Sequence, residues 1–258
     1  MKENENPEGA YTFRPIGYFH SCFKEKFGIP RQPGIVENAR GQLELLPDHG
    51  SPDTVRGLED FSHIWLLFVF HAVTHRRQRT TVRPPRLGGN RRMGVFATRS
   101  GFRPNPIGMS VAELEGISRR QGSLLLHLKG IDLLDGTPVL DVKPYLPYAD
   151  AVMKATGGFA ETEQPPLLRV EFDPEPLRHC MDREAADIPE LHRFIVQMLE
   201  NDPRPAYHRK HPQPKTFGTK VFDLEVRWVV SGDQARVIEI RQQPVPHEPG
   251  IIAARKNC

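Results

Sequence analysis

The sequence has few cysteines, and they follow no pairing pattern. Cys22, Cys180 and Cys258 are widely separated, odd in number and without a CxxC spacing. This excludes the disulfide framework of a small secreted domain and argues against a zinc finger. We therefore expect three reduced thiols.

Long apolar runs are also absent. The longest run, at residues 64–70, is far shorter than the roughly 20 residues that a membrane-spanning helix needs. The polar opening MKENENPEGAYTF contains no apolar core of a signal peptide. We expect no membrane association and a cytoplasmic location.

The sequence lacks the pattern of the doubly wound nucleotide-binding fold. That fold requires alternating helices and a Gly-rich turn after its first strand, and neither is present, so a Rossmann-type fold is disfavoured. His71 and His75 lie four positions apart, but no glutamate completes a zinc-protease motif. We expect no metal site.

Positive charge, by contrast, is locally concentrated. The formal net charge is only +3, but residues 83–110, RPPRLGGNRRMGVFATRSGFRPNPIGMS, interleave arginines with Gly and Pro, and no acidic residue interrupts them. A second basic concentration follows at residues 204–220. Rigid turns that carry guanidinium groups favour an anionic ligand such as a phosphate backbone or a carboxylate. For either cluster alone, a solvated surface loop remains the alternative.

The first part of the chain consists of short β-type segments. They are separated by Gly, Pro and Asp rather than by helix-length segments, and they lie at residues 12–20, 41–46, 61–71, 93–98, 108–117, 124–134 and 139–145. Many consecutive short strands leave exposed edges unless the sheet closes. We therefore expect a closed or nearly closed β-barrel over residues 1–155, followed by a polar linker at residues 156–166.

A smaller domain is expected over residues 167–258. Residues 168–172 alternate apolar and polar side chains, as in a strand. Asp187 and Glu190 have the spacing of a helix capping box, and apolar residues then recur at helical spacing over residues 191–199. This stripe predicts a helix packed against a core.

A hairpin is expected near the end of the chain. Residues 222–230 alternate apolar and polar side chains, Ser231-Gly232-Asp233 reads as a turn, and a second strand follows at residues 237–240. The expected fold is thus mainly β, with an N-terminal barrel and a smaller C-terminal α+β domain.

Five sequence stretches carry a resemblance to a known family. In chain order they are PIGYFHSCFKEKFGIPRQPG from Pro15, RGLEDFSHIWLLFVFH from Arg56, the arginine segment, DLLDGTPVLDVKPYLPYAD from Asp132 and DPRPAY from Asp202. They are spread over residues 15–207, which is most of the length of the chain, and the chain resembles the TsaA-like or TrmO-like proteins. The resemblance implies the same β-barrel and an S-adenosylmethionine-dependent enzyme that methylates N6 of the modified adenosine at position 37 of certain tRNAs.

The resemblance also implies the cofactor residues. Methyl transfer from a sulfonium needs alignment and exclusion of water rather than a protein nucleophile, so positioning residues should dominate. For Arg99, the alternative is that it only holds its own turn, and for Asp135-Gly136 it is a plain turn between strands. The implied S-adenosylmethionine contacts are Gln32, Pro33, Gly34, Phe70, His71, Arg99, Met109, Asp132, Leu133, Leu134, Asp135, Gly136 and Thr137.

The acceptor in this family is threonylcarbamoyladenosine, methylated on N6 to N6-methyl-N6-threonylcarbamoyladenosine. We expect Tyr207 to stack on the base or accept its proton, with Asp202 and Arg204 positioning it and Asp202 as the second catalytic candidate. The alternative is that DPRPAY is only a rigid turn that ends the preceding helix. Unstacked anticodon-loop bases are read by stacking and edge contacts while cations hold the phosphates, and the expected RNA contacts are Arg86, Arg91, Arg92, Arg204, Arg209 and Lys210.

Family members are understood to act as homodimers with the cofactor close to the subunit interface, so a homodimer that binds the tRNA anticodon stem-loop is expected. Two other functions stay open at this point. One is a non-catalytic barrel that binds an adenosyl ligand, and the other is an RNA-binding module without chemistry.

Overall fold

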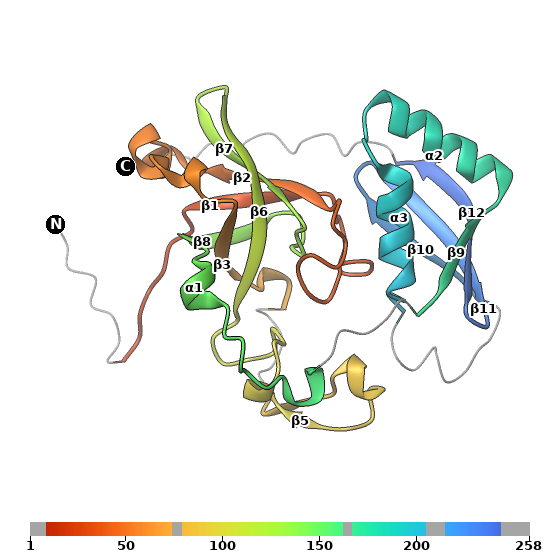
Figure 1. Ribbon diagram of the computed structural model, residues 1–258, viewed down its shortest axis with the longest axis horizontal. Coiled ribbons are helices and arrows are strands. Elements are labelled where there is room, and N and C mark those ends of the chain that lie inside the picture. The colour runs from red at the N-terminus through yellow and green to blue at the C-terminus, as the bar shows by residue number, and fades with distance from the viewer. Residues whose placement is uncertain (1–8, 74–78, 162–166, 205–214, 244–258) are drawn as a thin grey trace, which may run out of the picture.

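The computed structural model describes residues 9–73, 79–161, 167–204 and 215–243. Its larger part is a closed barrel with the strand order β1-β2-β7-β6-β3-β8, so the expected barrel is confirmed (Figure 1). Neighbouring strands are antiparallel all round the barrel. The strands are β1 (Gly17–Ser21), β2 (Arg40–Leu45), β3 (His63–Val69), β6 (Ile107–Arg120), β7 (Ser123–Lys129) and β8 (Thr137–Pro144).

Period-two alternation sends apolar side chains into the barrel core. Every second residue of β3 is buried, so Ile64, Leu66 and Phe68 belong to the core. Phe19 of β1 and Leu43 of β2 are fully buried as well. Burying one such side chain contributes roughly 1.5–3 kcal/mol relative to exposure. A one-residue slip would reverse the faces of a whole strand, and the pattern therefore fixes the register.

The strand expected at residues 93–98 is mostly not a strand. Within this range only β5 (Met93–Gly94) forms a strand, and it pairs with β4 (Thr81–Val82). The 3-10 helix η6 (Val95–Ala97) follows directly. The surrounding Gly and Pro residues limit strand length because they weaken or interrupt a hydrogen-bonded ladder.

The C-terminal part is a four-stranded sheet of order β10-β11-β12-β9, with two helices packed on it (Figure 1). The expected hairpin and the smaller α+β part are confirmed, and β9 pairs parallel to β12. Within the described ranges, no helix combines the length and apolarity needed to cross a membrane. The elements are β9 (Arg169–Phe172), α2 (Pro174–Ala186), α3 (Leu191–Glu200), β10 (Thr216–Val221), β11 (Leu224–Ser231) and β12 (Gln234–Gln242).

The capping box expected at Asp187 and Glu190 is wrong. Asp187 ends α2, where its two carboxylate oxygens accept hydrogen bonds of 2.9 and 2.8 Å from Arg183. Glu190 precedes α3 with a φ of 60° and makes no side-chain cap. A bidentate guanidinium–carboxylate pair is stronger than a neutral capping bond, and it takes the Asp187 side chain away from α3.

The connection between β1 and β2 fastens the two parts of the chain together. Phe23 forms a β-bridge with Val221, and the backbone N–H of Phe222 donates to the carbonyl of Cys22 at 2.7 Å. The ring of Phe27 stacks on Trp228 with centroids 5.7 Å apart and planes 7° from parallel. Barrel and C-terminal sheet therefore share one continuous apolar core.

Candidate active site at one end of the barrel

One end of the barrel gathers the residues that the sequence assigns to the cofactor. Strands β1, β3 and β7 run toward this end and β2, β6 and β8 leave it, so the connections at residues 22–39, 70–106 and 130–136 meet there. These connections contain all the assigned residues except two, and Thr137 begins β8 while Met109 is the third residue of β6. The closed antiparallel topology thus brings distant sequence positions to one place.

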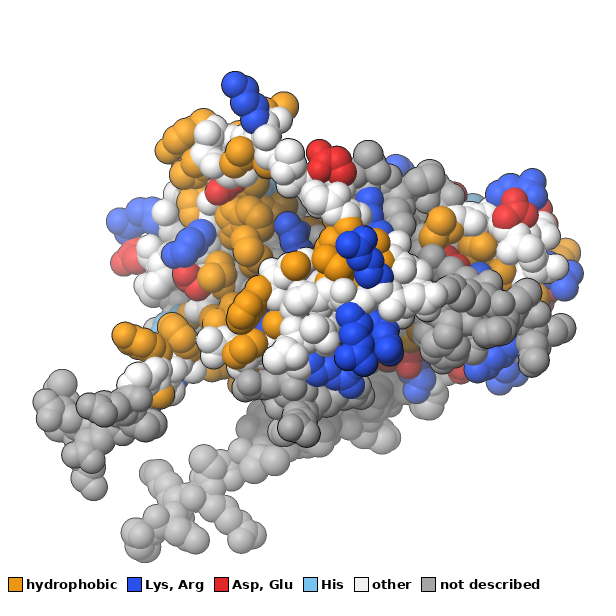
Figure 2. Space-filling model, turned by 90° about the horizontal axis from the view of Figure 1, so that it is seen from below, with side chains coloured by type: hydrophobic (Ala, Val, Ile, Leu, Met, Phe, Trp, Pro, Cys, Tyr) orange, Lys and Arg blue, Asp and Glu red, His pale blue; other side chains and the backbone are white. Residues whose placement is uncertain are grey.

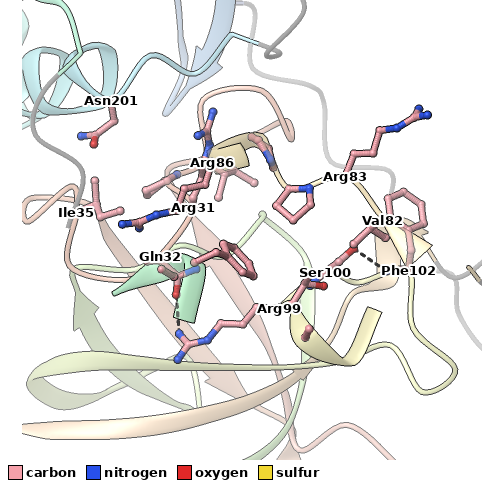
Figure 3. A pocket seen from close by; sticks show the side chains of 18 of the residues that line it. Arg31, Gln32, Ile35, Val82, Arg83, Arg86, Arg99, Ser100, Phe102 and Asn201 are labelled. Carbon is pink, nitrogen blue, oxygen red and sulfur yellow. Dashed lines mark hydrogen bonds between the residues drawn. The ribbon is translucent and has the colours of Figure 1, made fainter. Parts of the chain in front are cut away.

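A hydrogen bond joins two of these connections. The Nη1 of Arg99 donates to the side-chain oxygen of Gln32 at 2.5 Å (Figure 3). The third connection is tied to the first by the backbone, because the N–H of Gly34 donates to the carbonyl of Gly130 at 2.8 Å. Both glycines have left-handed φ angles, 79° and 70°, which side chains other than glycine rarely adopt. Arg99 is exposed, but Gln32 holds its guanidinium at the mouth of the barrel.

Asp132 places a partly buried carboxyl group at the same end. The hydroxyl of Ser110 on β6 donates to Asp132 Oδ1 at 2.5 Å. Burial raises the pKa of Asp132 to about 6, while the Ser110 hydrogen bond and the positive charge of Arg99 act in the opposite direction. The protonation state of this group therefore responds to charges placed beside it near neutral pH.

The Asp135-Gly136 turn is not a hairpin, because β7 and β8 are not neighbours in the barrel. The backbone N–H of Thr137 donates to the carbonyl of Leu134 at 3.2 Å, and Gly136 has a φ of 73°. The carboxylate of Asp135 accepts a 2.8 Å bond from the backbone N–H of Ser21. These bonds fasten the turn to the end of β1.

The remaining assigned residues differ in exposure. Leu133 is buried in the core, whereas Met109 is 55% exposed on the outside of the barrel. The ring of Phe70 meets that of Phe68 edge to face at 5.1 Å. Partial burial lowers the pKa of His71.

Within the described ranges, no three His, Cys, Asp or Glu side chains cluster as metal ligands would.

A cleft of about 1670 Å³ opens between this barrel end and the C-terminal part. None of the described residues that line it is acidic. Figure 3 shows Arg31 and Arg86 between Gln32 and Asn201, and Figure 2 shows Lys and Arg side chains gathered over the middle of the face that it views. The cations of the lining are Lys26, Arg31, Arg79, Arg83, Arg86, Arg92 and Arg99.

The cleft holds only some of the residues selected from the sequence. It brings together Gln32, Pro33, Arg86, Arg92 and Arg99, and Arg91 is not part of its described lining.

Several lining residues were missed by sequence reasoning. Arg31 could have been predicted because it adjoins Gln32 in the same turn. Phe96 and Phe102 could have been predicted because they are aromatic residues within the arginine segment. Asn201 follows α3 and had no local signal, since only the packing of the C-terminal part places it at the cleft.

Asp202 and Arg204 form a buried ion pair directly after α3. Arg204 Nε and Nη2 donate to the two Asp202 oxygens at 2.7 and 3.0 Å, and the residues are 8% and 2% exposed, respectively. Asp202 has a φ of 45°, and the Arg204 guanidinium lies over the Phe217 ring. This part of DPRPAY is a rigid turn that holds Pro203 in the cleft lining. Tyr207, Arg209 and Lys210 lie outside the described residues.

Comparison with known proteins agrees with this architecture. Residues 18–151 match the family model of the tRNA-methyltransferase O N-terminal domain, and residues 165–243 match the TrmO C-terminal domain. The tRNA (adenine(37)-N6)-methyltransferase of Escherichia coli K12 is 47% identical over 86% of this chain and 94% of its own length. A Pseudomonas aeruginosa protein, provisionally named as the S-adenosylmethionine-dependent methyltransferase RcsF, is 48% identical over 90% of this chain and 98% of its own.

Solved structures show the same fold. A crystal structure of TrmO from P. aeruginosa is similar with a TM-score of 0.75 and 42% identity, covering 92% of this chain and all of that one. Both family models, the relatives and the structure agree over the barrel and the C-terminal part. The chain therefore belongs to the TrmO family, the S-adenosylmethionine-dependent tRNA (adenine(37)-N6)-methyltransferases.

Proposed function

We propose that this enzyme methylates N6 of threonylcarbamoyladenosine at position 37 of tRNA, giving N6-methyl-N6-threonylcarbamoyladenosine. The observation that carries the proposal is the cleft at the barrel end, which is lined by cations and has no acidic residue among its described lining. The threonyl group adds a carboxylate to the base, and the anticodon loop adds phosphates. Guanidinium groups bind both kinds of anion through paired hydrogen bonds.

The residues at the barrel end have the donors and acceptors that S-adenosylmethionine requires. The molecule offers a carboxylate, an ammonium group, ribose hydroxyls and an adenine edge, and when bound it supplies the electrophilic methyl group. Arg99, steadied by Gln32, would hold the carboxylate, while Asp132 supplies an acceptor for an ammonium or hydroxyl group. Backbone groups of the turns at residues 32–34 and 132–137 would complete the site, together with Phe70, His71 and Met109.

The acceptor nitrogen carries a hydrogen, and the attached carbonyl delocalises its lone pair. It therefore loses this proton as its bond to the methyl carbon forms and the bond from that carbon to sulfur breaks. A group that accepts this proton, or turns the nitrogen toward the methyl, acts mainly in the transition state. We assign this role to the Tyr207 side chain, which turns the nitrogen through a hydrogen bond to its hydroxyl or, as tyrosinate, takes the proton and becomes a neutral phenol. The buried pair of Asp202 with Arg204 supports a positioning role for Asp202, since its two carboxylate oxygens already bind a guanidinium.

The wider assembly follows from the same assignments. Arg86 and Arg92 line the cleft and are proposed RNA contacts, and Arg209 and Lys210 extend the set. Ile107 and Met109, which are 38% and 55% exposed on β6 beside the barrel end, support a homodimer interface next to the cofactor. Isologous contacts bury such exposed apolar side chains. We propose a cytoplasmic location, which a tRNA substrate supports.

Two synthetic anticodon stem-loop RNAs test the substrate. They are identical except for the threonylcarbamoyl group on adenosine 37, and each is incubated with the full-length protein and S-adenosylmethionine. Mass spectrometry of the nucleosides should find the methyl group only on the modified RNA. Equal methylation of the unmodified adenosine would show that the carboxylate-bearing group is not recognised.

The role of the cleft is tested by Arg86→Ala, with Arg91→Ala as the matched change outside the described lining. Both arginines belong to the same segment, so both variants lose one charge from the same loop. Arg86→Ala should weaken stem-loop binding more than Arg91→Ala does. Equal effects would indicate general charge attraction rather than a cleft contact.

A further inference from the structure

Phe96 is an exposed aromatic residue in a cationic setting. Its side chain is 76% exposed, and it lies in the cleft lining three positions before Arg99. The guanidinium of Arg103 lies 6.0 Å from the centre of the ring. A second hollow of about 560 Å³ borders the same residue and is lined by Arg79, Thr80, residues 94–97 and Pro104. Phe96 thus borders both recesses.

The backbone under Phe96 is firmly held. The N–H of Val95 donates to the carbonyl of Thr80 at 3.0 Å, and the side chain of Val95 is only 4% exposed. The N–H and the hydroxyl of Thr98 both donate to the carbonyl of Val95, at 3.1 and 2.8 Å. Arg103 Nη1 in turn donates to the carbonyl of Thr98 at 3.2 Å. With the backbone held in this way, only the two side-chain torsions of Phe96 lose freedom when a ligand covers the ring.

The chemistry around the ring indicates which ligand covers it. An apolar partner would place its own surface against Arg79 and Arg103 without a described acidic group of the cleft lining to balance their charge. A single-stranded nucleic acid has both components that this surface lacks, a flat base for the ring and phosphates for the cations. Stacking on aromatic rings beside arginines is the usual way in which proteins hold unstacked RNA bases.

We propose that Phe96 is a stacking platform for an anticodon-loop base next to the target adenosine. The platform lies close to Arg99 in the sequence, and Arg99 is bonded to Gln32 at the barrel end, so a base on the ring would be a neighbour of the one that enters the methylation site. The inference rests on the proposed function because it takes the anticodon loop as the ligand. It adds a residue that fixes the register of the loop rather than one that takes part in the chemistry.

Binding of an anticodon stem-loop to full-length variants tests the platform. Phe96→Ala should raise Kd about 5- to 150-fold, the range that loss of one base–aromatic stack produces. Phe96→Trp should retain affinity, and Phe96→Leu, which keeps an apolar side chain but no aromatic face, should behave like Phe96→Ala. Phe13→Ala removes another exposed phenylalanine, 66% exposed on the N-terminal segment, and should leave Kd unchanged.

A double-mutant cycle identifies the stacked base. Stem-loops with an abasic site at each loop position in turn are bound to the wild type and to Phe96→Ala. At one position next to adenosine 37, the loss of binding free energy from Phe96→Ala and the loss from the abasic site should not add, because each change removes the same contact. Three results would overturn the proposal. They are losses of binding free energy that add at every loop position, equal binding by Phe96→Leu and the wild type, and a loss of affinity that accompanies dissociation of a dimer in sedimentation.

The same measurements separate this inference from the proposed function. If the double-mutant cycle shows coupling at one loop position but the modified RNA is not methylated, the stacking platform stands and the proposed substrate is rejected. If the modified RNA is methylated but Phe96→Ala does not change Kd, the proposed substrate stands and the stacking platform is rejected.

Discussion

Replacing Asp132 with asparagine should change how the stability of the ligand-free protein depends on pH. Burial raises the pKa of this carboxyl group from 3.8 to about 6. The folded state therefore binds a proton more tightly than the unfolded state, and the contribution of Asp132 to stability is fully present below pH ~4. That contribution is lost as the pH rises through about 6. Asparagine keeps the shape and an oxygen that can accept the Ser110 hydrogen bond, but it does not titrate.

The size of the effect follows from the shift. Each pKa unit corresponds to about 1.36 kcal/mol, so a rise from 3.8 to about 6 corresponds to at most about 3 kcal/mol. The free energy of unfolding of Asp132→Asn, minus that of the wild type, should increase by about 2–3 kcal/mol between pH 4 and pH 7. Other carboxyl groups titrate in both proteins, and their contributions cancel in the difference.

Urea unfolding at a series of pH values measures this difference, and carbon-detected NMR titration of the Asp132 carboxyl group measures the pKa itself. Ser110→Ala provides a second test, because the Ser110 bond favours the ionised form and its loss should move the titration to higher pH. A difference that stays flat from pH 4 to pH 7, or an Asp132 carboxyl group that titrates near 4, would refute the reasoning.

Three further changes test the assigned roles. Arg99→Ala should weaken S-adenosylmethionine binding by about 1.5–3 kcal/mol in calorimetry, the loss typical of a charge-assisted hydrogen bond, and unchanged affinity in a folded variant would make Arg99 structural or RNA-contacting. Asp202→Ala should reduce the free energy of unfolding by about 3–5 kcal/mol because it leaves the Arg204 charge buried and unpaired. The double variant Asp202→Ala/Arg204→Met should recover much of this loss. Equal stabilities of Asp202→Ala and the wild type in thermal unfolding would contradict a structural pair. Tyr207→Phe should slow single-turnover methylation at saturating tRNA while Kd for tRNA stays nearly constant, and a full rate would remove the hydroxyl from the chemistry.

Local sequence patterns determined much of the fold and the chemical character of the site. The two-residue period of a strand places Ile64, Leu66 and Phe68 on one face of β3, and that face is buried. Side chains alternate between the two faces of a strand, so only one orientation of the strand buries all three. The turn expected at Ser231-Gly232-Asp233 joins the two expected strands, with Ser231 as the last residue of β11. The arginine segment, rich in Gly and Pro, forms one wall of a cleft whose described lining has no acidic residue.

Where a side chain had more than one available partner, the sequence did not decide between them. Asp187 has the spacing of a helix cap, but the guanidinium of Arg183 is within reach once α2 has formed. Helix α2 itself was not predicted. Asp135-Gly136 looks like a hairpin turn, yet β7 and β8 pair with other strands, so the turn crosses an end of the barrel instead.

Tertiary structure alone brought the parts of the site together. Arg99 and Gln32 are 67 positions apart and meet because barrel closure directs their two connections to the same end. Phe27 stacks on Trp228 of the other part, and this packing brings Asn201 and Pro203 into the lining of the same cleft as the arginines. Local periodicity reports which face of a strand is buried, but strand order and docking depend on pairings between distant segments. The sequence by itself therefore determined the residue types of the site, and closure of the barrel with docking of the C-terminal sheet decided which of them face one another.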